Sequence, residues 1–313
     1  METPAGCPTT PDWDNLMSQG HDLIILDPGS KKILRCDENG KVIRVLRDDL
    51  DKFPDGVCID HPNGHIYMTR MGEYDQKTGT SFGFDGSIWR MDMDGSDFIE
   101  LVGSDRTRTP KQLKLDVDGG KMYWCDREGL KVKRANLDGS DLEVLVSTGK
   151  VPDDERDESR WCVGIAIDFD NRLVYWTQKG DADGGKGSVR RAGLDLPGGE
   201  SPEDRSDIEV LFDNLPEPID LELVGGYLYW SDRGNLPGGN SVSRASVSAD
   251  GKVIGKPEIV IEGVGEAIGF VIDREHNYLF VNDISGKLYR SALDGSNLTV
   301  LGQFGQLTGA TLT

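Results

Sequence analysis

The sequence predicts an all-β fold, a six-bladed β-propeller whose blades are four-stranded antiparallel sheets. Three observations predict it: an aromatic or apolar tetrapeptide recurs six times, an arginine follows every copy, and a short apolar segment recurs between copies. The tetrapeptides begin at residues 24, 67, 123, 175, 229 and 280, so the repeats are 43 to 56 residues long. Repeats of this length with alternating strands are typical of propeller blades, whereas helical repeats are usually shorter.

The tetrapeptide forms the second strand of each expected blade. Its copies are Ile24–Asp27, Tyr67–Arg70, Tyr123–Asp126, Tyr175–Gln178, Tyr229–Asp232 and Phe280–Asp283. Successive residues of a strand point to opposite faces of the sheet, so adjacent tyrosine and tryptophan side chains can contact both neighbouring blades. We therefore expect these strands to form the core between the blades.

The other three strands of each blade flank the tetrapeptide. The inner apolar segments are Gly56–Asp60, Gln112–Asp116, Gly164–Asp168, Asp220–Val224, Gly269–Asp273 and Gly309–Thr313. The third strands carry the recurring arginines, which are Arg35, Arg90, Arg134, Arg191, Arg244 and Arg290. Hairpin turns such as Leu137–Ser140 follow them, and an outer strand such as Leu142–Val146 completes the blade. We expect the arginines to form ion pairs between blades with the acidic ends of the tetrapeptides.

The first tetrapeptide has no inner strand before it, and the last inner segment has no tetrapeptide after it. We expect Gln306–Thr313 to complete the first blade and close the ring, which removes the open strand edges. Residues 1–20 are then an N-terminal extension, and residues 21–313 form a single propeller domain.

The three recurring features, which are the tetrapeptide, the arginine and the inner apolar segment, resemble those of the YWTD propellers. These propellers are built from six class B repeats of the low-density lipoprotein receptor. The resemblance covers about residues 21–313, although the first, second and sixth tetrapeptides depart from the family sequence. Stand-alone propellers of this family include hetero-Diels-Alderases of fungal secondary metabolism, and this chain is similar to them in length and organisation. The resemblance implies a small-molecule enzyme that needs no cofactor.

The composition narrows the choice of partners and compartment. The formal net charge is −20, from 35 basic and 55 acidic residues, and such a surface repels nucleic acid and anionic membranes. No apolar run approaches the ~20 residues that cross a bilayer, and Met1–Gly20 lacks the basic start and apolar core of a signal peptide. Five cysteines, most of them inside expected strands, do not indicate a disulfide framework. We expect a cytoplasmic monomer.

Long, irregular loops gather at one rim of the expected ring, where outer strands return to inner strands. The two longest are Met71–Ser87 and Ser147–Val163. Long loops on one face of a rigid scaffold commonly bind ligands. The aromatic candidates for substrate binding in these loops are Tyr74, Phe82, Phe84 and Trp161. Trp161 stands outside every recurring aromatic column, and it either contacts a ligand or plugs the mouth of the central channel.

Polar residues occupy the starts of the inner strands, where a purely structural ring favours glycine, proline or apolar residues. They are Asp55, Lys111, Gln112, Glu217, Asp220 and Glu266. Because the inner strands surround the axis, we expect these side chains to converge on the central channel and contact a substrate. An apolar funnel with a few polar groups is typical of a small-molecule site. Farther along the channel, Lys114 and Glu222 either pair with each other or hold water.

Acidic loops and histidines give little evidence for a metal ion or a catalytic triad. Asp92–Asp97 lacks the distal glutamate of a calcium loop and matches a hairpin, and Asp181–Gly185 is expected to be a solvated turn. The histidines are His21, His61, His65 and His276. They are expected at the rim opposite the long loops, so neither a serine triad nor a zinc site is expected in the funnel.

Three functions are compatible with these observations. In the first, the ring is a pericyclase, a hetero-Diels-Alderase that joins a heterodiene to an alkene in an apolar terpenoid or polyketide-like substrate. The four aromatic candidates hold the hydrocarbon, and the donors to the developing oxyanion are Arg160, Lys111 and Gln112. In the second, a metal-dependent lactonase, the metal ligands are Asp55, Glu217, Asp220 and Glu266. In the third, the ring is a non-catalytic module that binds a peptide or protein.

Overall fold

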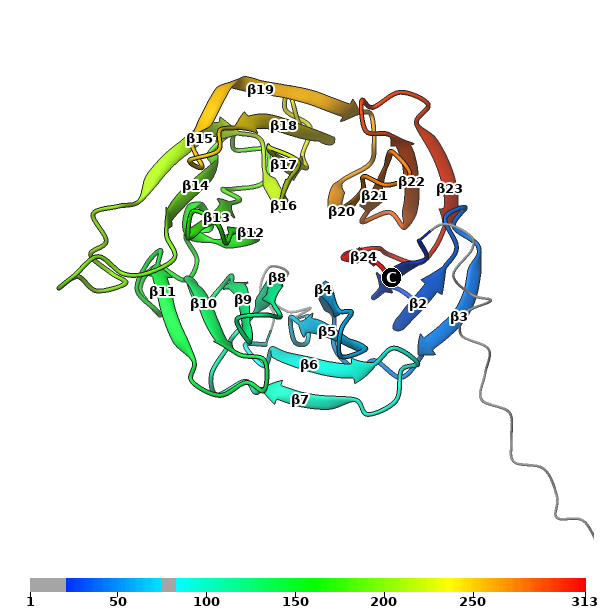
Figure 1. Ribbon diagram of the computed structural model, residues 1–313, viewed down its shortest axis with the longest axis horizontal. Helices are drawn as coiled ribbons and strands as arrows, with labels where there is room; N and C mark the ends of the chain where they lie inside the picture. Colours follow the sequence, from blue (N-terminus) through cyan, green and yellow to red (C-terminus); the bar gives the residue numbers. More distant parts are fainter. Residues whose placement is uncertain (1–20, 75–82) are drawn as a thin grey trace, which may run out of the picture.

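Six antiparallel sheets stand around a central axis and form a closed ring (Figure 1). The computed structural model describes residues 21–74 and 83–313. In this part of the chain every sheet has four strands, and the single helical turn is η2, the 3-10 helix Glu158–Arg160. The expected fold, a six-bladed propeller of four-stranded antiparallel blades, is confirmed.

In every blade the strands follow one order from the axis outward: inner strand, tetrapeptide strand, arginine strand and outer strand (Figure 1). The first two blades contain β24 (Ala310–Leu312), β1 (Leu23–Asp27), β2 (Lys32–Cys36), β3 (Val42–Arg47), then β4 (Pro54–Asp60), β5 (His65–Arg70), β6 (Ser87–Asp92), β7 (Ile99–Val102). The next two contain β8 (Pro110–Asp116), β9 (Lys121–Asp126), β10 (Lys131–Asn136), β11 (Glu143–Ser147), then β12 (Cys162–Asp168), β13 (Leu173–Gln178), β14 (Gly187–Gly193), β15 (Glu209–Leu215). The last two contain β16 (Pro218–Val224), β17 (Tyr227–Asp232), β18 (Ser241–Val247), β19 (Val253–Glu262), then β20 (Ala267–Asp273), β21 (Tyr278–Asp283), β22 (Lys287–Ala292), β23 (Thr299–Gln303).

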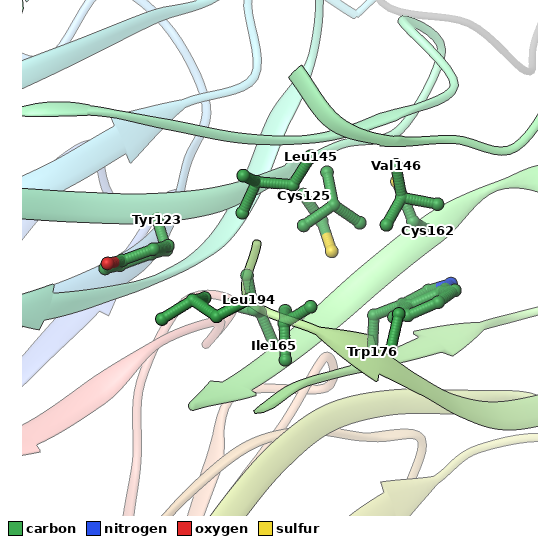
Figure 2. Packing of buried hydrophobic residues seen from close by; sticks show 11 residues of the cluster. Tyr123, Cys125, Leu145, Val146, Cys162, Ile165, Trp176 and Leu194 are labelled. Carbon is green, nitrogen blue, oxygen red and sulfur yellow. The ribbon is translucent and has the colours of Figure 1, made fainter. Parts of the chain in front are cut away.

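The tetrapeptide strands form the core between blades, as the alternation of their side chains predicts. Trp124, Trp176 and Trp230 are at most 1 % exposed. Trp176 of β13 packs in one cluster with Cys125 of β9 and Val146 of β11, which belong to the preceding blade (Figure 2). Each blade therefore buries its aromatic residues against its neighbour, and the repeated contact holds the ring together.

The inner strands approach one another closely around the axis, and glycine makes this possible. A Cβ atom added to Gly56, Gly164 or Gly269 would collide with the backbone of the next inner strand. The glycine at the third position of each of these strands thus lets neighbouring blades approach closely at the axis.

The C-terminal strand closes the ring. β24 pairs antiparallel with β1, with Leu23 opposite Leu312 and Ile25 opposite Ala310. The Asp27 carboxylate accepts hydrogen bonds from the backbone N–H groups of Gly305 and Gln306, at 3.0 Å each. The expected closure by the end of the chain is confirmed, and the inner edge of β1 is paired rather than open.

The recurring arginines differ from the prediction in their partners. Arg134, for example, pairs with Glu143 of the same blade at 2.8 Å, and in the next blade its guanidinium lies 3.5 Å from the Leu194 carbonyl and 3.8 Å from the Asp195 carboxylate. The expected partners, the acidic ends of the tetrapeptides, are therefore wrong: the recurring arginines that form ion pairs use other carboxylates, and the contact of Arg134 with Asp195 is the one that joins two blades among the ion pairs of these arginines in the described residues. The acidic ends of the tetrapeptides are already engaged by peptide groups: Asp126, for instance, accepts from the Thr109 N–H at 2.8 Å.

Neither a membrane span nor a disulfide occurs within residues 21–74 and 83–313. None of the helices formed by these residues has the length and apolar character that crossing a bilayer requires. Cys36, Cys58, Cys125 and Cys162 are free thiols, and all four lie in strands, as expected. Cys7 lies outside the described residues.

Candidate functional site

A cavity of about 330 Å³ lies at the axial mouth, on the rim where the inner strands begin. We call this rim the cavity rim; it holds the starts of the inner strands and the ends of the tetrapeptide strands. The residues that line the cavity are Phe53, Asp55, Met71, Tyr74, Lys111, Arg127, Arg233, Ile268, Ile284, Gln306 and Thr308. The lining combines apolar walls with three cationic side chains and one carboxylate, as expected for a site that holds a polar group of an apolar molecule.

Three predicted residues meet in a buried cluster at this mouth. The Lys111 ammonium donates to the Asp55 carboxylate at 2.5 Å, and the Gln112 amide donates to the other carboxylate oxygen at 3.5 Å. Asp55 is 1 % exposed, and burial lowers the pKa of Lys111. Lys111 also lies 3.0 Å from the Met71 sulfur. The strand starts of β4 and β8 thus place a desolvated cation on the cavity wall, held by a single carboxylate.

Two arginines add positive charge to the same wall. The Arg233 guanidinium pairs with Glu217 at 2.8 Å and approaches Glu266 at 3.8 Å. Arg127 pairs with its neighbour Glu128 through two hydrogen bonds. Each arginine immediately follows a tetrapeptide strand, β17 or β9, and therefore projects from the cavity rim. The three cationic side chains at the cavity therefore come from two blades: Lys111 and Arg127 from the third and Arg233 from the fifth.

Trp161 lies beside this wall but does not line the cavity. It is 5 % exposed, and its ring stacks against the Arg127 guanidinium at 4.6 Å and the Lys179 ammonium at 5.4 Å. Its indole N–H donates to the Glu155 carbonyl at 2.8 Å. The Trp161 ring therefore packs between residues of the third and fourth blades beside the mouth, and its contact with a ligand stays a prediction.

The other predicted loop residues are spread over the rim. Tyr74 lines the cavity and is 50 % exposed. Phe84 stacks on the Arg108 guanidinium at 4.6 Å and is not among the lining residues. Arg160 pairs with Asp157 at 3.0 Å and lines a separate pocket that also contains Trp176 and Arg190. Phe82 lies outside the described residues.

The four carboxylates proposed as metal ligands do not gather at the cavity. Asp55 is bonded to Lys111, and Glu217 lies 2.7 Å from Lys179 and 2.8 Å from Arg233. Glu266 is 54 % exposed, and Asp220 lies deeper, where its carboxylate accepts from the N–H groups of Leu221 and Phe270 at 2.8 and 3.3 Å. A divalent cation requires several hard oxygen ligands around one point. These oxygens already have cationic or peptide partners in different places, so the cavity does not fit a catalytic metal ion.

Below the cavity, two charged side chains meet across the channel. Lys114 of β8 pairs with Glu222 of β16, which is the first of the two arrangements expected for them. Burial raises the pKa of the nearby Asp220 to about 7 and that of the Cys58 thiol to about 12. This part of the channel is thus an enclosed polar layer beneath the cavity.

The sequence reasoning missed eight lining residues, and a regular signal identifies four of them. Met71, Arg127, Arg233 and Ile284 each stand one position after a tetrapeptide, at the point where that strand reaches the cavity rim. The position directly after the tetrapeptide therefore varies between apolar and cationic residues, and an alignment of the six repeats reveals this variation. Ile268 and Thr308 stand directly before an inner segment, as Asp55 and Lys111 do, whereas Phe53 and Gln306 carry no comparable signal.

The fold and the cavity together define a class of protein: a six-bladed YWTD-type propeller with a small-molecule-sized cavity at the mouth of its axial channel. The chain is 41 % identical over 312 residues to a protein of Pyricularia oryzae named low-density lipoprotein receptor-related protein 1, which covers 93 % of this chain and 98 % of that protein. The chain therefore belongs to the family of propellers with low-density-lipoprotein-receptor class B (YWTD) repeats.

Further comparisons agree on the fold. A protein of Cochliobolus heterostrophus, the 3-hydroxyacyl-CoA dehydrogenase-like protein LAM1, is 36 % identical over 277 residues, and the match spans 85 % of this chain and 57 % of that longer protein. No protein-family model matches the chain. Among solved structures, a chain of the nidogen/laminin complex has a TM-score of 0.69 at 18 % identity, with 94 % of this chain and 98 % of that chain covered. A gluconolactonase of Xanthomonas campestris has a TM-score of 0.57 at 19 % identity over 84 % and 82 % of the two chains.

Proposed function

We propose that this protein is a small-molecule enzyme, a cofactor-independent hetero-Diels-Alder [4+2] cyclase that uses the axial cavity to hold its substrate. The observation that supports the proposal is the composition of that cavity, in which Lys111, Arg127 and Arg233 share the wall with apolar side chains. Its volume of about 330 Å³ lies within the ~300–1,000 Å³ of ordinary ligand pockets. The substrate is an apolar, terpenoid or polyketide-like molecule that carries a conjugated carbonyl.

The chemistry requires position and a hydrogen-bond donor rather than proton or electron transfer. A heterodiene, with oxygen at one end, adds to an alkene; one C–C and one C–O bond form, the π electrons rearrange, and no group leaves. Negative charge grows on the heterodiene oxygen as the bonds form, and a preorganised cation stabilises that charge. Ile268 and Ile284 supply an apolar wall for the alkene, and confinement of both partners lowers the entropic cost of their meeting.

The two alternatives have less support. For hydrolysis of a lactone by a bound metal ion, the carboxylates of the mouth do not form a ligand set, and the likeness to the gluconolactonase concerns the fold alone. For a module that binds a peptide, the cavity has no extended groove among its lining residues in the described part of the chain.

The proposal is tested with a quinone-methide-like heterodiene, generated from a stable precursor, and a trapping alkene. We expect the protein to accelerate the cycloaddition and to change the ratio of product stereoisomers. The variant Ile268→Trp fills the cavity without removing a charge, and we expect it to lose this effect. The matched control is Ile254→Trp, which makes the same change at a residue of β19 that is 56 % exposed.

Rate and isomer ratio are measured with and without protein by chiral chromatography. An isomer ratio and rate equal to those in buffer would contradict the proposal, as would equal activity of the Ile268→Trp and Ile254→Trp variants. Thermal unfolding of both variants checks that each remains folded.

A further inference from the structure

We propose that His21, Asp273 and His276 form a binding site for a divalent transition-metal ion, with the chemistry that Zn²⁺ prefers, at the rim opposite the cavity. We call this rim the turn rim; it holds the turns between the inner and tetrapeptide strands. His21 directly precedes β1 of the first blade, whereas Asp273 ends β20 and His276 lies in the β20–β21 turn of the sixth blade. The site therefore lies across the seam where the ring closes.

The three side chains bring their donor atoms together. One donor atom of each residue lies within 4.8 Å of the other two, and no other group of three such residues occurs within residues 21–74 and 83–313. The Asp273 Oδ2 atom is shared: it lies 2.8 Å from Nδ1 of His276 and 3.5 Å from Nδ1 of His21. The imidazole rings meet edge to face, with centroids 5.1 Å apart.

The surroundings of His21 indicate which of its nitrogens is available. Its Nε2 atom lies 3.3 Å from the Glu275 carboxylate, which favours the tautomer with the proton on Nε2. Its Nδ1 atom then carries the lone pair, and this atom is buried without a hydrogen-bond partner among the described residues. A carboxylate that holds one nitrogen of an imidazole while the other is left to bind is the usual outer-shell arrangement of a metal-ligating histidine.

A cation between these atoms resolves an unfavourable contact. Without one, the Nδ1 lone pair of His21 faces the Asp273 oxygen at 3.5 Å, and two electron-rich atoms repel each other. Zn–N bonds of about 2.0–2.1 Å in a tetrahedral site place the ligand atoms about 3.3 Å apart. The observed 2.8 and 3.5 Å lie on either side of that value, and the third pair, one nitrogen of each histidine, lies within 4.8 Å, so binding requires the two rings to move closer together.

The ligand types select the class of metal. Two imidazoles and one carboxylate suit Zn²⁺ and neighbouring transition metals, whereas Ca²⁺ and Mg²⁺ require mostly oxygen ligands. Three protein ligands leave at least one coordination position for water. Because the ligands come from the first and sixth blades, a bound ion connects the start of β1 to the sixth blade and stabilises the closure that β24 provides.

The experiment uses untagged full-length protein, treated with EDTA and dialysed, and titrates ZnCl₂ by isothermal calorimetry. We expect one equivalent to bind and the melting temperature to rise by a few degrees at saturation, because the ion binds only the folded chain. His21→Gln and His276→Gln should each lose both effects. Glu275→Gln should keep the stoichiometry but weaken binding by about 10- to 100-fold, as expected for a residue that orients a ligand.

The matched control is His65→Gln. His65 also faces an aspartate on the turn rim, Asp92 at 3.5 Å, but it belongs to no group of three ligand side chains in the described part of the chain. We expect this variant to bind Zn²⁺ as the wild type does. Absence of binding to the wild type, or binding that survives in His21→Gln and His276→Gln, would overturn the proposal. Since all variants are compared in the metal-free state first, a loss of folding is distinguished from a loss of ligands.

Discussion

The two rims of the ring are built by different kinds of contact. On the turn rim, the aspartates that end inner strands bond to the backbone three residues later: Asp60 to Asn63, Asp116 to Gly119 and Asp168 to Asn171, at 2.8–3.1 Å. On the cavity rim, the corresponding contacts join residues far apart, such as Lys111 and Asp55, separated by 56 positions. Local bonds repeat from blade to blade, whereas long-range ion pairs differ in each blade. The side-chain contacts that differ from blade to blade, such as the Lys111–Asp55 pair, are therefore most frequent on the cavity rim.

The largest expected difference between the rims concerns stability. Asp55→Asn leaves the Lys111 ammonium buried without its carboxylate, and we expect a loss of about 3–5 kcal/mol in the free energy of unfolding. Chemical denaturation of wild type and variant measures it. In the double variant Asp55→Leu with Lys111→Met both charges are absent, so most of the loss should be recovered. An Asp55→Asn variant as stable as the wild type would show that the buried Asp55–Lys111 pair does not stabilise the cavity rim.

On the turn rim the equivalent substitution should cost less. Asp60→Ala removes the hydrogen bonds that the carboxylate accepts from the Asn63 backbone and side chain, at 3.1 and 2.9 Å. The change breaks a local turn and leaves no buried charge, so we expect a loss of about 1 kcal/mol under the same denaturation conditions. A loss equal to that of Asp55→Asn would remove the energetic distinction between the rims.

A further difference is a slope of stability with pH, and it separates two aspartates of the same column. Burial raises the pKa of Asp232, in the fifth blade, from 3.8 to about 8. Between these values the unfolded chain has lost the proton and the folded chain retains it, so the free energy of unfolding falls as pH rises through this window. Asp232→Asn should have a smaller fall, measured by denaturation at a series of pH values.

Asp27, at the same position in the first blade, is the matched control with the opposite sign. Burial alone would raise its pKa, but hydrogen bonds from Ser30, Gly305 and Gln306 lower it overall. Its contribution to stability is present above pH 3.8 and is lost as pH falls through the lower folded value. Asp27→Asn should therefore lower the free energy of unfolding at neutral pH and reduce the slope of the acid limb, with no change of slope above pH 3.8. Identical pH profiles for the two variants would contradict the assignment.

Predictions for strand residues placed more of the candidate site than predictions for loop residues, of which Tyr74 alone lines the cavity within the described part of the chain. Asp55, Lys111 and Gln112 begin inner strands, and they meet at the mouth as their register implies. Arg160 and Trp161 follow a loop from residue 148 whose path depends on its own turns and on contacts with other blades. Alternation along a strand sets the direction of a side chain, but no such rule applies across an irregular loop.

By itself, the sequence determined the all-β class, the six blades, the closure by the last strand and the rim at which polar residues gather. These follow from local periods and turn chemistry, which act over a few residues and repeat. Only the tertiary structure decided which charges pair across the cavity, that Trp161 is buried between cations, and that His21 meets His276 across the seam. Those contacts join residues that are distant along the chain, and their distances depend on how all six sheets pack around one axis.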